Sequence, residues 1–217
     1  MTAAHPSTEQ DSTGQRLIGA AGEVFAEVGY AQATVREICA RAGVNIAAVN
    51  YYFGNKLGLY TAVLKSTLCS AHEAMRQAVR QAPSPQEKLR TFVRFGLEHM
   101  LGRERPAWRL RLMTHELSQP TPALPSVVDE VIRPSYELLL SIVAEVVERP
   151  PQHPRTRMCA HSILGQLTHY AHGRAVIQHL WPSLKMTPRH IALLADHIVE
   201  FSLGGLKAVR TKRRRRS

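Results

Sequence analysis

The side chains best suited to chemistry in this 217-residue chain lie in one short segment, Thr34–Lys56, and they suit contact with DNA bases. Asn50 carries an amide that can donate and accept hydrogen bonds together at an adenine edge. Ile46, Ala47 or Ala48 could touch the methyl group of a thymine. Because the residues around Asn50 carry almost no charge, reading of sequence there depends on amide, hydroxyl and apolar contacts.

The pattern of this segment predicts two short helices joined by a tight turn. Thr34 is an N-cap type of residue with Glu37 three positions later, which predicts the start of the first helix. Gly43 can adopt the left-handed conformation that ends it, and Asn45 can cap the second helix, which reaches about Tyr52. Two such helices form the helix-turn-helix unit that presents its second helix to a DNA major groove.

Three motifs in order over residues 16–64 resemble the TetR family of transcriptional regulators. They are A-x-E-V-F-A-E-V-G-Y, T-V-R-E-I-C-A-R-A-G-V and Y-Y-F-x-N-K-x-x-L. Further along, H-E-L-S-Q-P-T-P-A-L at 115–124 and V-I-R-P at 131–134 are similar to the C-terminal domain of the CecR-like subgroup. The chain departs from the family at Asn50, which stands where an aromatic residue is usual.

The resemblance implies which residues of the segment meet DNA. Thr34, Tyr52 and Lys56 match positions that contact the DNA backbone, and Arg36 matches a position that can reach a base, where arginine prefers guanine. Asn45 could contact DNA or serve purely as a helix cap. The predicted DNA-binding set is Thr34, Arg36, Asn45, Ile46, Ala47, Ala48, Asn50, Tyr51, Tyr52 and Lys56.

Composition indicates an all-α fold. Hydrophobic residues make up 44% of the chain, enough for a core, while aromatic residues make up 6% and no strand-like alternation stands out. There is no apolar run of about 18 residues and no signal peptide pattern, so we expect a cytoplasmic protein without a membrane segment. Cys39, Cys69 and Cys159 are widely spaced, which favours reduced thiols.

The formal net charge of +11 is concentrated at the C-terminal end. Seven basic residues between Lys207 and Arg216 leave +4 for the rest of the chain. Both parts should attract phosphate without reading sequence. The Arg213–Arg216 run is either a functional arm or a solvated end.

Apolar spacing and breakers predict the domain organisation. A first helix is expected at 13–28, and a long fourth helix from Asn55 to about Gln81 should join two domains with a boundary near Leu57. Later helices are expected at 86–101, 105–117, 126–147 with a possible kink at Pro134, 155–180 and 188–209. The predicted division is a flexible arm at 1–12, a three-helix helix-turn-helix DNA-binding domain at 13–56, a helical effector-binding and dimerisation domain at 57–210, and a basic tail at 211–217.

The C-terminal domain should hold an effector pocket and a dimer interface. Pocket candidates that mix polarizable apolar surface with polar groups are Trp108, Met113, His115, Glu116, His161 and His169. Trp108 and Met113 could instead be ordinary core, and Glu116 could brace the loop that follows it. In TetR-like proteins the last two long helices form the dimer interface, and here the Phe201–Leu206 cluster suits close packing.

A stripe of His161, Gly165, Thr168, His172 and His179 also permits a metal hypothesis, since His169 and His172 are three residues apart. No cysteine or carboxylate lies at a matching spacing. Histidines that hydrogen-bond at an interface or pocket are therefore favoured, and neither a metal nor a cofactor is expected.

These patterns together predict a ligand-responsive DNA-binding regulator and no enzyme, because nucleophile-elbow, phosphate-loop and metalloprotease motifs are missing. We expect a homodimer, most simply a repressor of a near-palindromic operator, that a small-molecule effector releases. One alternative is a helical small-molecule- or metal-binding protein with a vestigial helix-turn-helix. Another is nonspecific nucleic-acid binding driven by the arginine tail.

Overall fold

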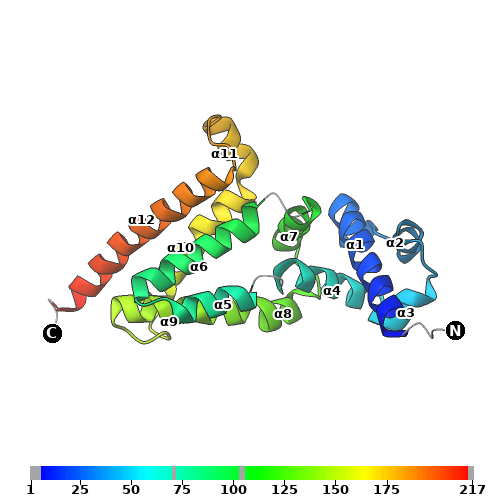
Figure 1. Cartoon of the computed structure of the whole chain (residues 1–217), viewed down its shortest axis with the longest axis horizontal. Helices are drawn as coiled ribbons and strands as arrows, with labels where there is room; N and C mark the ends of the chain where they lie inside the picture. Colours follow the sequence, from blue (N-terminus) through cyan, green and yellow to red (C-terminus); the bar gives the residue numbers. More distant parts are fainter. Residues whose placement is uncertain (1–5, 70–71, 103–105, 215–217) are drawn as a thin grey trace. The chain divides into compact units, whose positions relative to one another are not determined.

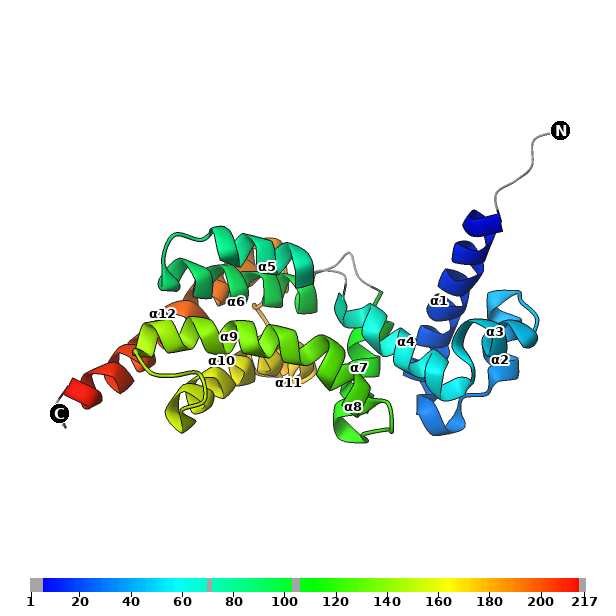
Figure 2. The ribbon, with the colours of Figure 1, turned by 90° about the horizontal axis from the view of Figure 1, so that it is seen from below.

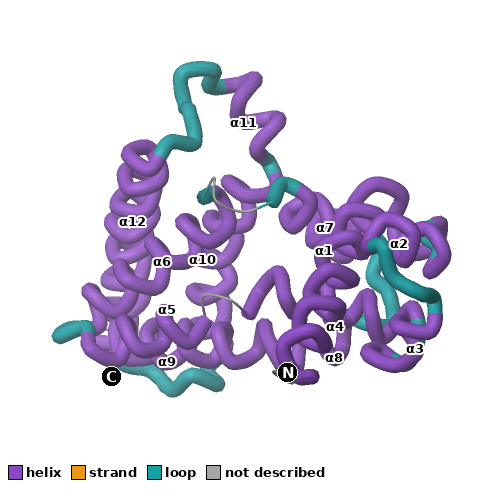
Figure 3. Tube along the Cα trace, turned by 45° about the vertical axis from the view of Figure 1, so that its right-hand side comes forward, coloured by secondary structure: helices purple, strands orange, loops and turns teal. Residues whose placement is uncertain are grey.

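The computed structural model describes residues 6–69, 72–102 and 106–214, and all the regular structure in these ranges is helical (Figure 3). The predicted all-α fold class is therefore confirmed. No helix in this part of the chain is long and apolar enough to cross a membrane.

The helices form two compact units, each described here by itself. The first contains α1 (Pro6–Gln32), α2 (Val35–Ala42), α3 (Ala47–Phe53), α4 (Lys56–Cys69), α7 (Trp108–Ser118) and α8 (Leu124–Val127). The second contains α5 (His72–Gln81), α6 (Pro85–Leu101), α9 (Arg133–Val147), α10 (Pro154–His172), α11 (Arg174–Leu180) and α12 (Pro188–Arg214). Packing thus groups α4, α7 and α8 with the helix-turn-helix. The functional division at residues 56 and 57 stays a prediction.

Helix α1 provides the core of the first unit. Leu17, Val24 and Phe25 on its inner face are fully buried, and α2 and α3 lie beside it (Figure 1). The helix begins at Pro6, earlier than the predicted residue 13, so residues 6–12 of the predicted arm are helical. Proline suits a first helical position, where its missing N–H would have no intrahelical partner. Residues 1–5 lie outside the described ranges. Gly29, with φ 79°, breaks the helical geometry where the sequence predicts the end.

The long fourth helix predicted from Asn55 to Gln81 corresponds to two described helices, α4 and α5, and residues 70 and 71 between them lie outside the described ranges. Helix α4 is described as far as Cys69 and α5 from His72, and the two fall in different units. The hydroxyls of Ser66 and Thr67 donate to the carbonyls of Val63 and Leu64, at 2.8 and 2.7 Å. Both hydroxyls therefore bond back to the preceding turn within α4.

Other helix limits also differ from the predictions. The helix predicted at 155–180 is divided at Gly173, a residue that weakens a helix interior, so His179 does not share a helix with His161. The irregularity predicted near Pro134 is a π-helical turn, Val128–Ile132, between α8 and α9. Helix α12 extends past the predicted residue 209 to Arg214, while the side chains of the Arg213–Arg216 tail lie outside the described part of the chain.

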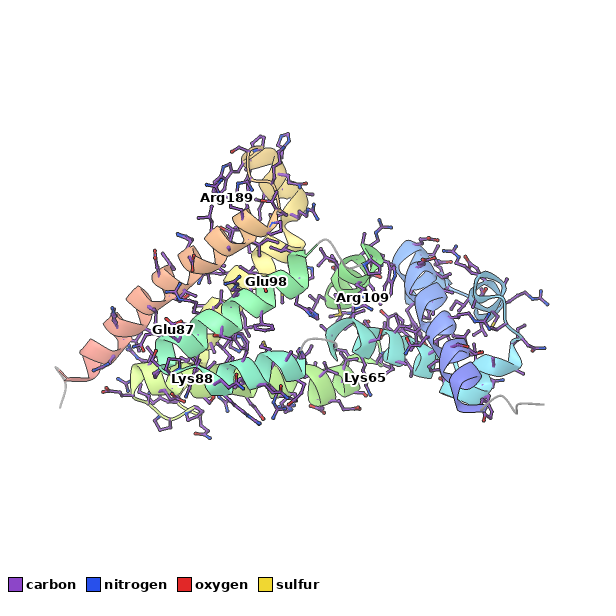
Figure 4. The ribbon with its side chains drawn as sticks, viewed as in Figure 1. Lys65, Glu87, Lys88, Glu98, Arg109 and Arg189 are labelled. Carbon is purple, nitrogen blue, oxygen red and sulfur yellow. The ribbon has the colours of Figure 1, made fainter. Side chains whose placement is uncertain are left out.

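In the second unit, α6 packs along α12 and α9 (Figures 1 and 2). Leu89 and Leu97 of α6 are fully buried. Ion pairs flank this core: Lys88, labelled in Figure 4, donates to Glu145 of α9 at 2.9 Å. Arg90 donates to Asp196 of α12 at 2.6 Å. Helices α9 and α12 therefore pack on α6, with these ion pairs beside the contact.

A close approach joins α1 to α7 within the first unit. A Cβ atom built on Gly22 would lie 2.5 Å from two ring atoms of Trp108. A Cβ on Gly19, one turn earlier, would meet nothing within 4 Å. The absence of a side chain at Gly22 is what allows the indole of Trp108 to pack on α1.

We expect Gly22→Ala to lower the free energy of unfolding by about 1–3 kcal/mol, because the added methyl overpacks the contact with Trp108. The control Gly19→Ala should raise it by about 0.5–1 kcal/mol, since alanine favours the helix and the space is open. Urea unfolding of both variants measures the difference. Equal stability of the two variants would contradict the packing described for Trp108.

Candidate nucleic-acid interface

The first helix of the turn motif is capped at both ends as the sequence predicts. The Thr34 hydroxyl accepts a hydrogen bond from the backbone N–H of Glu37 at 3.2 Å. At the other end Gly43 has φ 65° and its N–H bonds to the carbonyl of Ala40. Ile38 is fully buried and anchors α2 in the core of the first unit.

The second helix, α3, is held by a few contacts and leaves most of its surface open. The side-chain oxygen of Asn45 accepts from the N–H of Ala47 at 2.9 Å, which caps the start of the helix. Val49 is fully buried. Tyr51 is 72% exposed and Ile46 is 46% exposed. The exposed surface of α3 carries no charged side chain, as the sequence indicates.

All the predicted DNA-binding residues lie on α2, α3, the start of α4 and the turns between them, within one compact unit. The exposed members are Thr34, Arg36, Asn45, Ile46, Ala47, Asn50 and Tyr51, and the half-buried members are Ala48, Tyr52 and Lys56. Asn45 acts as a cap. A DNA role for each of these residues stays a prediction.

Lys56 is held in place by neighbours at the end of α1. Its ammonium donates to the carbonyl oxygen of Ala31 at 3.2 Å and lies 4.7 Å from the ring centre of Tyr30. An ammonium has three N–H donors. Lys56 can therefore keep this contact and still donate to a phosphate.

Arg41 joins α2 to α1 through ion pairs, a role that the sequence analysis did not predict. Its guanidinium donates to both carboxylate oxygens of Glu27, at 2.9 and 3.0 Å, and lies 3.7 Å from Glu37. The hydrogen bond from Arg41 holds the pKa of the Glu27 carboxyl below its usual value. The available signal was the spacing of four between Glu37 and Arg41 on one helix.

Glu116, a predicted pocket residue, is a fully buried bridge between segments. Its carboxylate accepts from the Tyr60 hydroxyl of α4 at 2.8 Å, from the Thr121 N–H at 2.9 Å and from the Thr121 hydroxyl at 3.1 Å. Burial, and then the bond to Glu116, raise the pKa of the Tyr60 phenol well above its usual value, so Tyr60 remains a donor. These are the contacts of a residue that braces the following loop.

Sequence reasoning also missed Tyr60 and Tyr30. Tyr60 lies four residues after Lys56, which places both on one helical face, and this spacing was the signal that could have found it. Tyr30 directly follows the glycine that ends the regular part of α1.

The six predicted pocket residues do not all belong to one unit. Trp108, Met113, His115 and Glu116 lie on α7 in the first unit, while His161 and His169 are exposed on α10 in the second. Trp108 packs against Gly22 as a core residue would. A common effector pocket stays a prediction.

The described residues contain no group of three or more His, Cys, Asp or Glu able to hold an ion. His161 instead lies 3.3 Å from the Tyr136 hydroxyl. Cys39 and Cys159 are free, and the side chain of Cys69 lies outside the described part.

Family models match both parts of the chain. Residues 17–63 match the model "Bacterial regulatory proteins, tetR family", and residues 85–206 match "HTH-type transcriptional dual regulator CecR, C-terminal domain". The second match covers more than half of the chain. This protein belongs to the TetR family. Within that family its C-terminal part is of the CecR type.

Individual relatives agree with this placement. The chain is 29% identical to the HTH-type transcriptional dual regulator CecR of Shigella flexneri over 75% of this chain and 77% of the relative. It is 27% identical to the fatty acid metabolism regulator protein of Bacillus subtilis over 61% of this chain and 67% of the relative. A structure of the regulator FadR from Bacillus subtilis in complex with stearoyl-CoA has a TM-score of 0.69 at 21% identity, covering 88% of this chain and 98% of that one. The last similarity shows a shared fold. This TetR-family chain is a transcriptional regulator and not an enzyme.

Proposed function

We propose that this TetR-family regulator is a ligand-responsive repressor that binds a near-palindromic operator as a homodimer and leaves it when a small molecule binds. The observation that carries the proposal is α3, which is anchored by buried Val49 and preceded by the capping bond of Asn45, and which exposes Ala47, Asn50 and Tyr51. A short, rigid, exposed second helix is what a helix-turn-helix needs to enter a major groove.

Sequence reading on α3 rests on uncharged groups. Asn50 contacts an adenine edge, and Ile46 with the neighbouring alanines contacts thymine methyl groups. Arg36 on α2 is exposed and reaches a guanine. Thr34, Tyr52 and Lys56 contact the phosphate backbone, which supplies affinity and register but no sequence information.

Two exposed stripes in the second unit support a dimer through the last long helices. On α12 the stripe consists of Leu193, His197, Phe201 and Gly204, spaced by four, four and three residues. Phe201 is 68% exposed, and a Cβ on Gly204 would meet nothing within 4 Å. Leu206, from the predicted cluster, is buried within the protomer instead.

On α10 the matching stripe consists of Met158, His161, Gly165 and His169, all exposed. A hydrogen bond of 3.2 Å from Gln166 to Ser202 ties α10 to α12 beside these stripes. Two helices that each present large apolar and small residues on one side suit a four-helix interface with a second copy. The two-fold axis then spaces two recognition helices about 34–36 Å apart or somewhat wider.

The effector acts on the segment from residue 57 to 210, which we propose as the effector-binding and dimerisation domain. A ligand shifts DNA binding only if it prefers the conformation that does not fit the operator. The relative with bound stearoyl-CoA supports including acyl-CoA molecules in an effector screen.

We expect Lys56→Ala to reduce the slope of log affinity against log salt concentration by about one, because one phosphate contact is lost. The control is Lys65→Ala, also on α4, whose ammonium is paired with Glu130 at 2.7 Å (Lys65 is labelled in Figure 4). Its slope should match that of the wild type. Fluorescence anisotropy with labelled operator DNA at several salt concentrations gives both slopes. An unchanged slope for Lys56→Ala would exclude the phosphate contact.

Phe201→Glu should convert the dimer to a folded monomer, because two buried carboxylates would face an apolar interface without partners. The control Val176→Glu changes a residue that is 61% exposed on α11, off both stripes, and should leave the dimer intact. Sedimentation equilibrium measures the mass of each variant. A Phe201→Glu protein that remains dimeric would place the interface elsewhere.

A further inference from the structure

A continuous set of contacts in the first unit leads from α7 to the predicted phosphate-contacting Lys56. It starts at the fully buried carboxylate of Glu116, which binds the Tyr60 hydroxyl. The ring of Tyr60 lies 4.8 Å from that of Tyr30, centre to centre, and the Tyr30 ring lies 4.7 Å from the Lys56 ammonium. Each contact therefore fixes the group that makes the next one.

The aromatic part of this set is closely packed. Tyr60 is 1% exposed and packs edge-on against Phe25 of α1, with 4.8 Å between ring centres. Edge-to-face pairs of this spacing have a preferred geometry that resists rotation of either ring. The hydroxyl bond to Glu116 holds the remaining end of Tyr60.

Tyr30 reaches this position because of the backbone turn before it. Gly29 has φ 79°, a left-handed conformation that glycine adopts without strain. After this turn the Tyr30 ring lies below Lys56, and the next residue, Ala31, presents its carbonyl oxygen to the same ammonium at 3.2 Å. Ring and carbonyl together direct the lysine side chain.

We propose that Tyr30 and Tyr60 are positioning residues for DNA binding, which hold the Lys56 ammonium where it meets a phosphate, and that Glu116 fixes Tyr60 from α7. This inference rests on the proposed phosphate contact of Lys56. It adds that the contact depends on side chains outside the helix-turn-helix motif. The carboxylate of Glu116 also binds Thr121 after α7, so the geometry of that loop is set by the same group that fixes Tyr60.

The test is a double-mutant cycle in DNA binding, with a duplex that the wild-type protein selects from random DNA as the probe. Tyr30→Leu removes the ring, Tyr30→Phe keeps it, and Tyr60→Phe removes the hydroxyl that binds Glu116. Each is made alone and together with Lys56→Ala. Tyr136→Phe, which alters a hydroxyl in the second unit, is the control.

We expect Tyr30→Leu to weaken binding about twofold to fivefold, the range of an exposed cation–π contact, and to reduce the salt slope. Tyr60→Phe should act in the same direction, while Tyr30→Phe and Tyr136→Phe should match the wild type. In the Lys56→Ala background neither Tyr30→Leu nor Tyr60→Phe should have any further effect, because the positioned ammonium is already gone.

A role in stability alone would give a different pattern. The inference would be overturned if the tyrosine substitutions weakened DNA binding by the same factor with and without Lys56. It would also be overturned if the Tyr30→Leu protein kept the wild-type affinity and salt slope. An unchanged slope for Lys56→Ala would instead remove the premise, and failure of the wild type to select any sequence would contradict the proposed function itself. The three failures are therefore distinguishable in one set of measurements.

Discussion

A carboxylate with no exposed surface must have its oxygens hydrogen-bonded, and in this protein that requirement connects three segments. Glu116 of α7 takes one hydroxyl from Tyr60 of α4 and two donors from Thr121 in the next loop. Loss of a donor would leave a buried charge poorly compensated, so the three segments keep one relative arrangement. Through the aromatic rings of Tyr60 and Tyr30, this arrangement extends to Lys56 at the edge of the predicted DNA-binding residues.

On the proposed DNA-binding surface, the residues that supply affinity differ from those that recognise the base sequence. Helix α3 is exposed and uncharged, so its contacts with bases depend on Asn50 and on apolar side chains such as Ile46. Positive charge comes from α2 and α4, through Arg36 and Lys56, and in the proposed complex it acts on phosphates without regard to base sequence unless the arginine reaches a guanine. The proposed dimer would place two copies of this small surface on one site, and the exposed stripes on α10 and α12 are its proposed interface.

Local signals in the sequence were sufficient to predict the helix-turn-helix, because its caps and turn depend on residues three or four positions apart. Thr34, Gly43 and Asn45 each make the cap or turn that their residue types predict. The grouping of α7 and α8 with the first unit could not be predicted in this way, since it depends on packing between helices far apart in the sequence. The pairing of Glu116 with Tyr60, 56 residues apart, depends on tertiary packing that periodicity does not encode. The resemblance located Glu116 but not its partner.

Selection of binding sites from random DNA by the full-length protein tests the central claim most directly. The account predicts an enriched, near-palindromic sequence whose half-sites are centred about one helical turn or somewhat more apart, because two α3 helices enter successive major grooves. The same sequence should be enriched after the Arg213–Arg216 run is removed, with lower overall affinity. Absence of any enriched sequence, or enrichment that disappears with the arginine run, would contradict a helix-turn-helix regulator and favour nonspecific binding through the tail.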